Sequence, residues 1–573
     1  MRSRTTLTGG RGEDPEAGPA GPADPAPGAP PGSAAGRAGA PTDAGSAADA
    51  GAGPRGIDSD AAIDADPAAD GGDAGTPPGT PVSGPPAAGA AAGGPAVRAA
   101  LDWARRLYWL WPALATLAVT AVGIGRAEPW RDEMATWSAA TRPFYQVLRM
   151  AHHVDAVTSP YYLFMWAWIR IAGDSPTAMR LPSLIAMVGT AGLLAVLGRR
   201  LFGVRVGVAA GLLFAVLPAT SRYAQEARGY AFAALFSVAS TLLLVRALDR
   251  PTRRRFLGYG LALYGLGLAN LLMLMVLVGH AVAVLTASRV TSDRRPLWRW
   301  LTAVVAVGVG VFPLVWLGRH QQGTQLNWVP LAKIELLPDL PGGLFGNPTA
   351  GGFVVGLAAV GWALRGRWGA VLGMAALGPV VLLYEAGQHE PLFVARYLIF
   401  AAPLLALLAA TNLERVRPAA ILAIVSVLAF VSANSQLGFR KTHEWPRSAP
   451  RSYSAAARIV EEHELPGDGI IFPNRSDWSF LDIAMSYYLR DRAPRDVLVN
   501  RTARQRGTLW ASECRDPVGC LAGTNRVWVV SIGEKIDPFT TMPAAKAAAL
   551  RTGYALNSRW TVPDLTITLY VRR

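Results

Sequence analysis

Apolar runs of about 14 to 23 residues recur between Leu107 and Val431, and several are long enough to cross a bilayer. Short arginine-containing loops separate them. Because positively charged loops stay in the cytoplasm, their positions predict about eleven crossings, with the N-terminus inside and the C-terminus outside. The expected spans are roughly 108–125, 177–198, 204–222, 229–248, 256–269, 271–287, 300–317, 352–364, 369–385, 396–411 and 418–434.

One apolar segment is too short to cross. Tyr161–Ala172 (YYLFMWAWIRIA) has about 12 residues, a length typical of re-entrant or interfacial elements. Its aromatic side chains suit the lipid headgroup region. Counting it as a span would move every later basic loop outside. We therefore predict a re-entrant or interfacial segment within a first outer loop, 126–176, and a second long outer loop at 318–351.

The two ends of the chain differ from its middle. Residues 1–97 are rich in Ala, Gly, Pro and Asp, with five arginines against twelve acidic residues. Such a segment cannot bury enough apolar surface to fold, so we expect a disordered cytoplasmic tail. Over 435–573, strand and helix patterns alternate, which predicts a small extracytoplasmic α/β domain. Its expected helices are Tyr453–Glu464, Phe480–Leu489 and Pro543–Arg551, and its expected strands are Gly469–Pro473, Asn525–Ile532 and Asp564–Val571.

The predicted fold class is thus a polytopic α-helical membrane protein, with its transmembrane domain at 98–434. Composition agrees, since 51% of the 573 residues are hydrophobic and only 17% are charged. The net charge of +15 could suggest a nucleic-acid partner. However, outside the tail the positive charge lies in short loops, where the positive-inside rule explains it, so no nucleic-acid partner is expected.

Cys514 and Cys520 are the chain's two cysteines, six positions apart. Outside the cytoplasm a local disulfide is favoured over two free thiols. No metal site is expected there, because neighbouring histidines are missing.

Asp132 and Glu133 follow the first expected span directly, on the predicted outer face. A carboxylate pair at a membrane surface costs desolvation energy and adds nothing to an apolar core. The pair is therefore a candidate for chemistry on a molecule held in the bilayer. The alternative is that it only marks a helix N-terminus.

Further polar clusters fall on the same predicted face. The candidate substrate-binding residues are His153, Asp155, Tyr161, Glu226, Arg228, Tyr230 and Arg396. Each has a simpler interpretation: a solvated loop for the histidine, an ion pair between Glu226 and Arg228, and snorkelling for Arg396. A divalent metal near the histidines is left open but not favoured, because adjacent side chains point to different faces. No cofactor is expected.

A carboxylate, arginines and aromatic rings at one lipid–water boundary suit the transfer of a group from a lipid phosphate. A carboxylate can deprotonate an incoming hydroxyl. Arginines can stabilise the departing phosphate.

The order of several motifs resembles a known family. RDEMATWS after the first span, then SPYYLFMW, MRLPSLIAMVGTAGLLAVLGRRLFG and QEARGYA, is similar to the GT-C superfamily of integral-membrane glycosyltransferases. The nearest groups are the protein O-mannosyltransferases and the aminoarabinose-transferase-like enzymes, with actinobacterial mannosyltransferases among them. The resemblance covers residues 107–250 well and ARYLIFAAP (395–403) weakly.

The resemblance implies an acidic catalytic base in the first outer loop, which Asp132 matches, with Glu133 next in line. It also implies a polyprenyl-phosphate sugar as donor, with mannose as the default sugar. The family often has His/Lys-Pro-Pro before the aromatic run, where this chain has Thr158-Ser159-Pro160. Arg228 or Arg396 would then replace the missing phosphate-binding residue.

We therefore expect an inverting glycosyltransferase at the outer face of the plasma membrane, in contact with membrane lipids, that transfers sugar to a glycan or protein hydroxyl. The alternative is a lipid or sugar transporter or flippase. Such proteins tend to show internal repeats and midplane charges, and neither is evident here.

Overall fold

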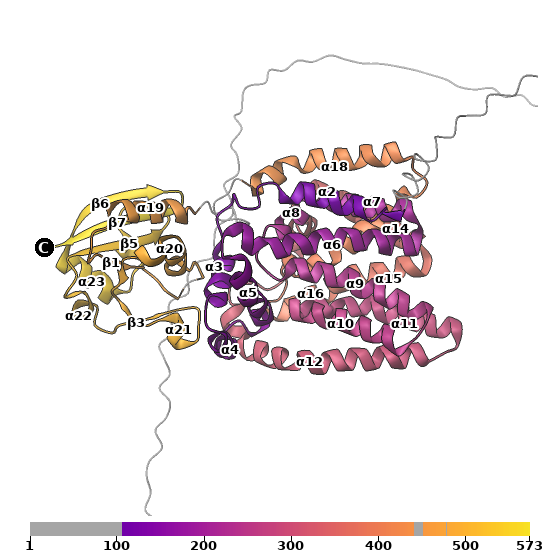
Figure 1. Cartoon of the computed structure of the whole chain (residues 1–573), viewed down its shortest axis with the longest axis horizontal. Helices are drawn as coiled ribbons and strands as arrows, with labels where there is room; N and C mark the ends of the chain where they lie inside the picture. Colours follow the sequence, from indigo (N-terminus) through magenta and orange to yellow (C-terminus); the bar gives the residue numbers. More distant parts are fainter. Residues whose placement is uncertain (1–105, 441–450, 477) are drawn as a thin grey trace, which may run out of the picture. The chain divides into compact units, whose positions relative to one another are not determined.

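The computed structural model describes residues 106–440, 451–476 and 478–573 (Figure 1). The predicted disordered tail, 1–97, lies outside these residues. The first helices are α2 (Leu110–Ala121), α3 (Arg131–Ala140), α4 (Phe144–His153), α5 (Ser159–Ala172), α6 (Pro176–Phe202), α7 (Val204–Val216), α8 (Pro218–Ala224), α9 (Tyr230–Asp249) and α10 (Arg253–Ala269). They continue with α11 (Leu277–Thr291), α12 (Arg295–Gln325), α13 (Leu340–Phe345), α14 (Pro348–Leu364), α15 (Gly366–Ala376), α16 (Gly378–His389), α17 (Ala402–Ala410) and α18 (Pro418–Phe439). Short 3-10 turns lie between some of these helices, including η1 (Ala156–Thr158), η2 (Leu271–Val276) and η4 (Ala395–Ala401).

Every expected span coincides with a helix, with two consecutive helices, or with a 3-10 turn followed by a helix. Among the described residues, seven segments are long and apolar enough to cross a membrane, or up to eight if the bent pair α7–α8 is one span. The remaining expected spans form shorter helices, such as α2 with 12 residues and α14 with 17. The polytopic helical class is confirmed, whereas the count of about eleven crossings stays a prediction.

Local sequence signals set the helix ends. The Ser175 side chain accepts a hydrogen bond from the Ala178 amide at the start of α6, and Pro176 occupies the first turn. Gly203, at φ +105°, ends this helix in a conformation that favours glycine. Pro218 forces Leu217 into an extended conformation, which gives the 69° bend between α7 and α8.

The short aromatic segment forms α5, a helix of 14 residues. At 1.5 Å per residue it spans about 21 Å, less than the roughly 30 Å hydrocarbon core. Its Tyr161 and Phe164 rings pack against Phe232 of α9, with ring centroids 6.1 and 5.2 Å apart. These contacts hold α5 against a candidate membrane span.

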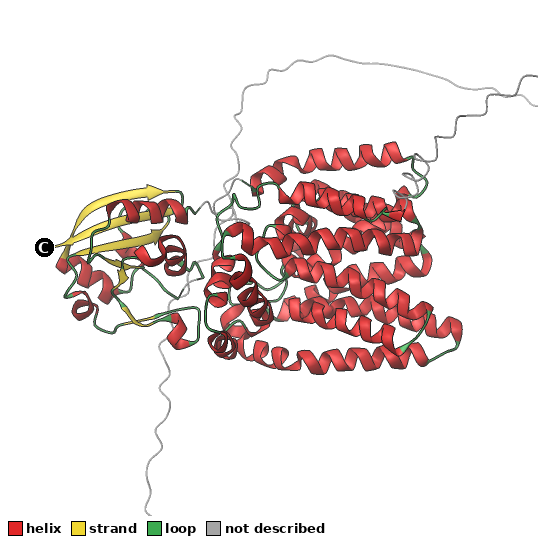
Figure 2. Cartoon of the chain, in the orientation of Figure 1, coloured by secondary structure: helices red, strands yellow, loops and turns green. Residues whose placement is uncertain are grey.

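The C-terminal part, in which Figure 2 shows the strands, is an α/β unit. Its strands are β1 (Gly469–Ile471), β2 (Arg495–Asp496), β3 (Val499–Arg501), β4 (Ser512–Glu513), β5 (Arg526–Ile532), β6 (Tyr554–Val562) and β7 (Leu565–Arg572). Its helices are α19 (Tyr453–His463), α20 (Leu481–Leu489), α21 (Ala503–Arg506), α22 (Pro517–Leu521) and α23 (Ala544–Gly553).

The main sheet has the strand order β2-β1-β5-β7-β6, with β1 parallel to both its neighbours and β7 antiparallel to both of its own. All six elements expected from the sequence are present. The long edge strand β6 was not expected. Most of its residues are exposed or half-buried, so it lacks the apolar alternation that reveals a buried strand.

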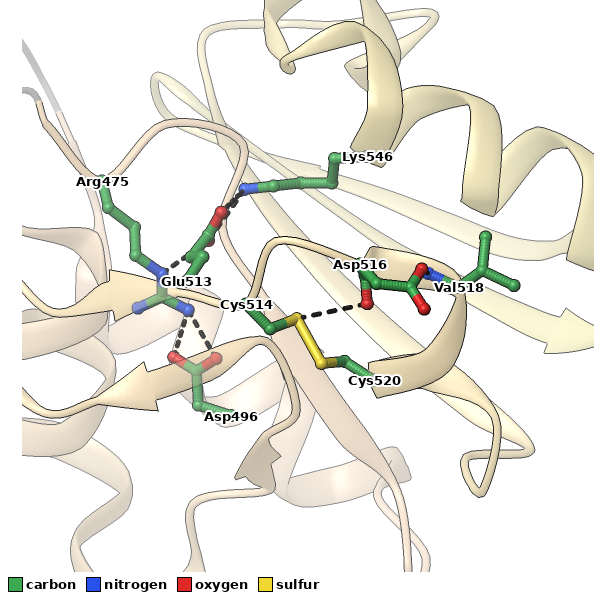
Figure 3. Close-up of a disulfide and its surroundings, with 8 residues drawn as sticks. All are labelled: Arg475, Asp496, Glu513, Cys514, Asp516, Val518, Cys520 and Lys546. Carbon is green, nitrogen blue, oxygen red and sulfur yellow. Dashed lines mark hydrogen bonds and ion pairs between the residues drawn. A yellow bond between two sulfur atoms is a disulfide. The ribbon is translucent and has the colours of Figure 1, made fainter.

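A charged cluster lies beside the disulfide of this unit (Figure 3). The Arg475 guanidinium contacts Asp496 and donates to Glu513 at 2.6 Å, while Lys546 contacts Glu513 at the same distance. Cys514, next to Glu513, is bonded to Cys520. The disulfide and the ion pairs therefore restrain the same loop.

Candidate functional site

The two adjacent carboxylates occupy the first turn of α3 but have different surroundings. Successive residues of a helix point about 100° apart. Glu133 is 1% exposed, and its oxygens accept hydrogen bonds from Arg180 at 2.7 and 2.9 Å and from the Ala227 amide at 2.9 Å. Its side chain also accepts a hydrogen bond from the Trp130 amide, which caps the N-terminus of α3. Glu133 thus ties α3 to α6 and to the turn before α9.

Asp132 instead lines a cavity of about 500 Å³. Its Oδ2 lies 3.7 Å from Nη1 of Arg396, and both side chains keep some exposure, 18% and 12% respectively. The cavity also receives residues from the C-terminal ends of α10 and α12. Its charged and aromatic lining includes Arg131, Asp132, Asp155, Arg228, Tyr230, Arg319, Trp328, Arg396 and Tyr397. The lining therefore carries more guanidinium groups than carboxylates.

Arg396 is held on aromatic faces in the turn η4. Its guanidinium carbon lies 4.8 Å from the ring centroid of Trp328 and 5.7 Å from that of Tyr397. Such stacking fixes the planar group and leaves its N–H donors directed outward from the ring. Its Nε is buried and has no hydrogen-bond partner within the described residues. A bound anion would satisfy that donor.

Arg228 reaches the same cavity through a chain of hydrogen bonds. Its Nη1 donates to the Tyr162 hydroxyl at 3.2 Å, and that hydroxyl donates to Oδ2 of Asp155 at 2.6 Å. Gln325 of α12 donates to the other oxygen of Asp155 at 3.1 Å. Burial raises the pKa of Asp155, against the effects of Arg228 and the Tyr162 hydroxyl. Asp155 therefore acts as a buried anchor for the groups that orient Arg228.

Asp155 also has an unusual backbone. It adopts φ +58° at the start of η1, a left-handed conformation that aspartate tolerates better than most residues. The conformation lies between the end of α4 and the start of η1, which leads into α5.

Glu226 lies behind the cavity wall. It is 1% exposed, and its Oε2 is 4.0 Å from Nε of Arg222. Burial raises the pKa of Glu226 to about 7, and Arg222 opposes that rise. The simpler interpretation, an ion pair between Glu226 and Arg228, is wrong: Glu226 lies beside Arg222, and the turn directs Arg228 to Tyr162.

Five predicted site residues line the cavity: Asp132, Asp155, Arg228, Tyr230 and Arg396. The other four do not. Glu133 and Glu226 are enclosed, Tyr161 packs among aromatic rings, and His153 is exposed with its Nδ1 2.8 Å from the Arg149 carbonyl oxygen.

Sequence reasoning missed the contribution of α12. Arg319, Gln322 and Gln325 line the cavity, yet they fall in the predicted loop 318–351. The available signal was the spacing of these residues at helical intervals directly after an apolar span. Within the described ranges, no group of three or more His, Cys, Asp or Glu side chains could hold a metal ion.

Comparisons with known proteins agree on the fold. Residues 159–316 match the family model described as dolichyl-phosphate-mannose-protein mannosyltransferase. That segment runs from α5 into α12 and does not include Asp132. No curated protein sequence matches significantly.

Two solved structures of ArnT from Cupriavidus metallidurans resemble this chain. The apo form has a TM-score of 0.53 at 14% identity, and the form bound to undecaprenyl phosphate has 0.54 at 15%. Each alignment covers 82% of this chain and 98% of the other. The chain therefore shares the fold of these two ArnT structures, as the resemblance implied.

Proposed function

We propose that this chain, which has the GT-C fold, is an inverting glycosyltransferase that moves a sugar from a polyprenyl-phosphate donor to a hydroxyl acceptor. The observation that carries the proposal is the pairing of Asp132 with Arg396 at the wall of a sizeable cavity. A base and an anion-binding group stand side by side, as a displacement at a sugar phosphate requires.

In the proposed reaction, Asp132 removes the proton of the acceptor hydroxyl. The acceptor oxygen forms a bond to the anomeric carbon, and the bond from that carbon to the phosphate oxygen breaks. The bonding electrons leave with the phosphate, and Asp132 keeps the proton. Attack opposite to the leaving group inverts the anomeric configuration.

Arg396 and Arg228 receive the phosphate. Their guanidinium groups can form paired hydrogen bonds to phosphate oxygens, which strengthen as negative charge develops there. Arg396 would then exchange its contact with Asp132 for the donor phosphate. No step of this scheme requires a metal or an organic cofactor.

The donor class is proposed from two findings about similar proteins. One ArnT structure contains undecaprenyl phosphate, and the matching family model is named for a dolichyl-phosphate mannose donor. Mannose is accordingly the first sugar to test. A glycan or a protein hydroxyl is the proposed acceptor.

We place the reaction on the outer face of the plasma membrane. The cavity lies at the C-terminal ends of α10 and α12, whereas the arginine-rich loops lie at their N-terminal ends. Since basic loops stay cytoplasmic, the opposite ends would face outward.

A transfer assay tests the function. Membranes containing the full chain are supplied with labelled mannosyl polyprenyl phosphate, and membranes lacking it serve as the control. We expect label to enter acceptors with release of one polyprenyl phosphate per sugar, and the product anomer to be opposite to that of the donor. Movement of the labelled lipid between leaflets without sugar transfer would instead support the flippase alternative.

A further inference from the structure

A groove of about 770 Å³ runs along α10 and α12, at the ends of these helices remote from the candidate active site. The two helices start together, since the Arg299 guanidinium donates to the Pro251 carbonyl, and they continue in parallel, with Trp300 Nε1 donating to the Tyr259 hydroxyl. The groove extends from Arg253 to Tyr264 on α10. At 1.5 Å per residue this is about 17 Å, close to the depth of one leaflet.

Small residues on α12 create the hollow. Ala303, Ala306 and Gly310 lie on one helical face and line the groove. On the opposite wall, Leu257 and Leu261 of α10 are 63% and 62% exposed. α12 as a whole faces outward, because only 11% of its most apolar stretch is buried, compared with 67% for α6. The groove is thus an apolar channel open to lipid.

One end of the channel is strongly basic. Arg253 and Arg299 line it together with Trp298, which is 64% exposed. Residues 246–299 contain nine arginines and two aspartates. Both aspartates are engaged: Asp249 pairs with Arg200, and Asp293 accepts a hydrogen bond from the Arg295 amide. Within the described chain, neither Arg253 nor Arg299 has a carboxylate partner.

The N-terminal ends of the two helices favour an anion. Arg253 opens α10 and Arg295 opens α12, so both helices carry cations at the positive end of the helix dipole. The positive-inside rule explains basic residues in these loops. It does not explain a hollow of acyl-chain length beneath them.

We propose that this groove binds an anionic glycerophospholipid. Arg253 and Arg299 would hold the phosphate headgroup, with Trp298 beside it, and one acyl chain would fill the channel between α10 and α12. The site is separate from the proposed transferase cavity and does not depend on that activity.

Native mass spectrometry of the full chain in detergent tests the site, with phosphatidylglycerol and phosphatidylcholine as probes. We expect phosphatidylglycerol to bind with at least tenfold higher affinity. Each arginine near a lipid phosphate contributes about fivefold, so Arg253→Gln with Arg299→Gln should weaken phosphatidylglycerol binding by about thirtyfold. Ala306→Leu, which fills the channel and keeps the charges, should weaken it as well.

The matched control is Arg254→Gln with Arg294→Gln, which removes the same charge from two exposed arginines outside the groove lining. It should change affinity by less than threefold. Equal binding of the two lipids, or an equal loss in the control, would overturn the proposal, since either shows non-specific attraction. Tighter binding of polyprenyl phosphate than of phosphatidylglycerol at these residues would overturn the assignment to a glycerophospholipid.

Discussion

Arg396 and Asp132, from distant parts of the chain, face one another across 3.7 Å at the wall of the candidate active site. This separation is too long for a hydrogen bond but short enough for a strong electrostatic interaction. The arginine is fixed on aromatic rings, whereas the carboxylate stands in the first turn of α3. The pair is therefore positioned to separate when a phosphate enters.

Arg396→Gln should lower kcat by about a hundredfold, because it removes a charged donor that acts on the leaving phosphate. Arg396→Lys should restore only part of the rate, since an ammonium cannot form the paired, stacked contact. The measurement is kcat and KM for the labelled lipid donor.

Arg319→Gln is the matched control for this prediction. Arg319 lines the same cavity, but it is 66% exposed and pairs with Glu390. Its loss should change kcat by less than about threefold, as expected for an exposed ion pair. If Arg319→Gln and Arg396→Gln lowered kcat equally, Arg396 would have no specific part in phosphate binding.

Glu133→Gln should destabilise the protein by about 3–5 kcal/mol, because it leaves Arg180 charged and without its partner in a buried site. Thermal or denaturant unfolding in detergent measures the change. Asp249→Asn, which removes an exposed partner of Arg200, should cost no more than about 1 kcal/mol. If Glu133→Gln proved fully stable but inactive, Glu133 would belong to the chemistry.

Glu226 should make stability depend on pH. Burial raises its pKa from an ordinary value of 4.5 to about 7, so the folded state holds the proton more tightly than the unfolded state. Between about pH 4.5 and 7 the folded protein therefore binds more protons, and its stability falls as pH rises. The full effect is on the order of 3 kcal/mol.

Glu226→Gln should remove this component. We expect the unfolding temperature of the variant, relative to the unsubstituted protein, to rise progressively from pH 5 to pH 8. The exposed Glu335→Gln serves as the control and should show no such trend. A constant difference between the Glu226 variant and the parent across this range would contradict the assigned titration.

Tyr162→Phe should raise the KM for the lipid donor while changing kcat less. The hydroxyl donates to Asp155 and accepts from Arg228, so its loss frees the guanidinium to move away from the cavity. Leaving the buried Asp155 without this donor should also cost about 1–3 kcal/mol of stability. Steady-state titration with the lipid donor measures the change in KM and kcat. Denaturant unfolding measures the loss of stability separately.

Much of the fold is predictable because its signals are local. A few neighbouring residues are enough to predict the apolar runs and the buried strands β5 and β7. The same holds for the helix starts at Pro176 and Pro218. β6 does not, because its stability comes from pairing with β7 rather than from its own apolar pattern.

The site is only partly predictable because it depends on distant contacts. The family resemblance ranks Asp132 ahead of Glu133 as the base, but the sequence does not show that Glu133 is the buried partner of Arg180. Likewise, the sequence shows Arg319 and Gln325 only as polar residues after a span. The continuation of α12 to Gln325 brings them to the cavity.

In the proposed mechanism Asp132 is the base. Asp132→Asn keeps the size of the side chain and removes its basicity, so single-turnover transfer from a mannosyl polyprenyl phosphate should slow by about 10²–10⁴-fold. Its unfolding temperature should stay close to that of the unsubstituted protein, unlike that of Glu133→Gln. Transfer by Asp132→Asn at an unchanged rate, with the protein folded and the donor bound, would contradict the account.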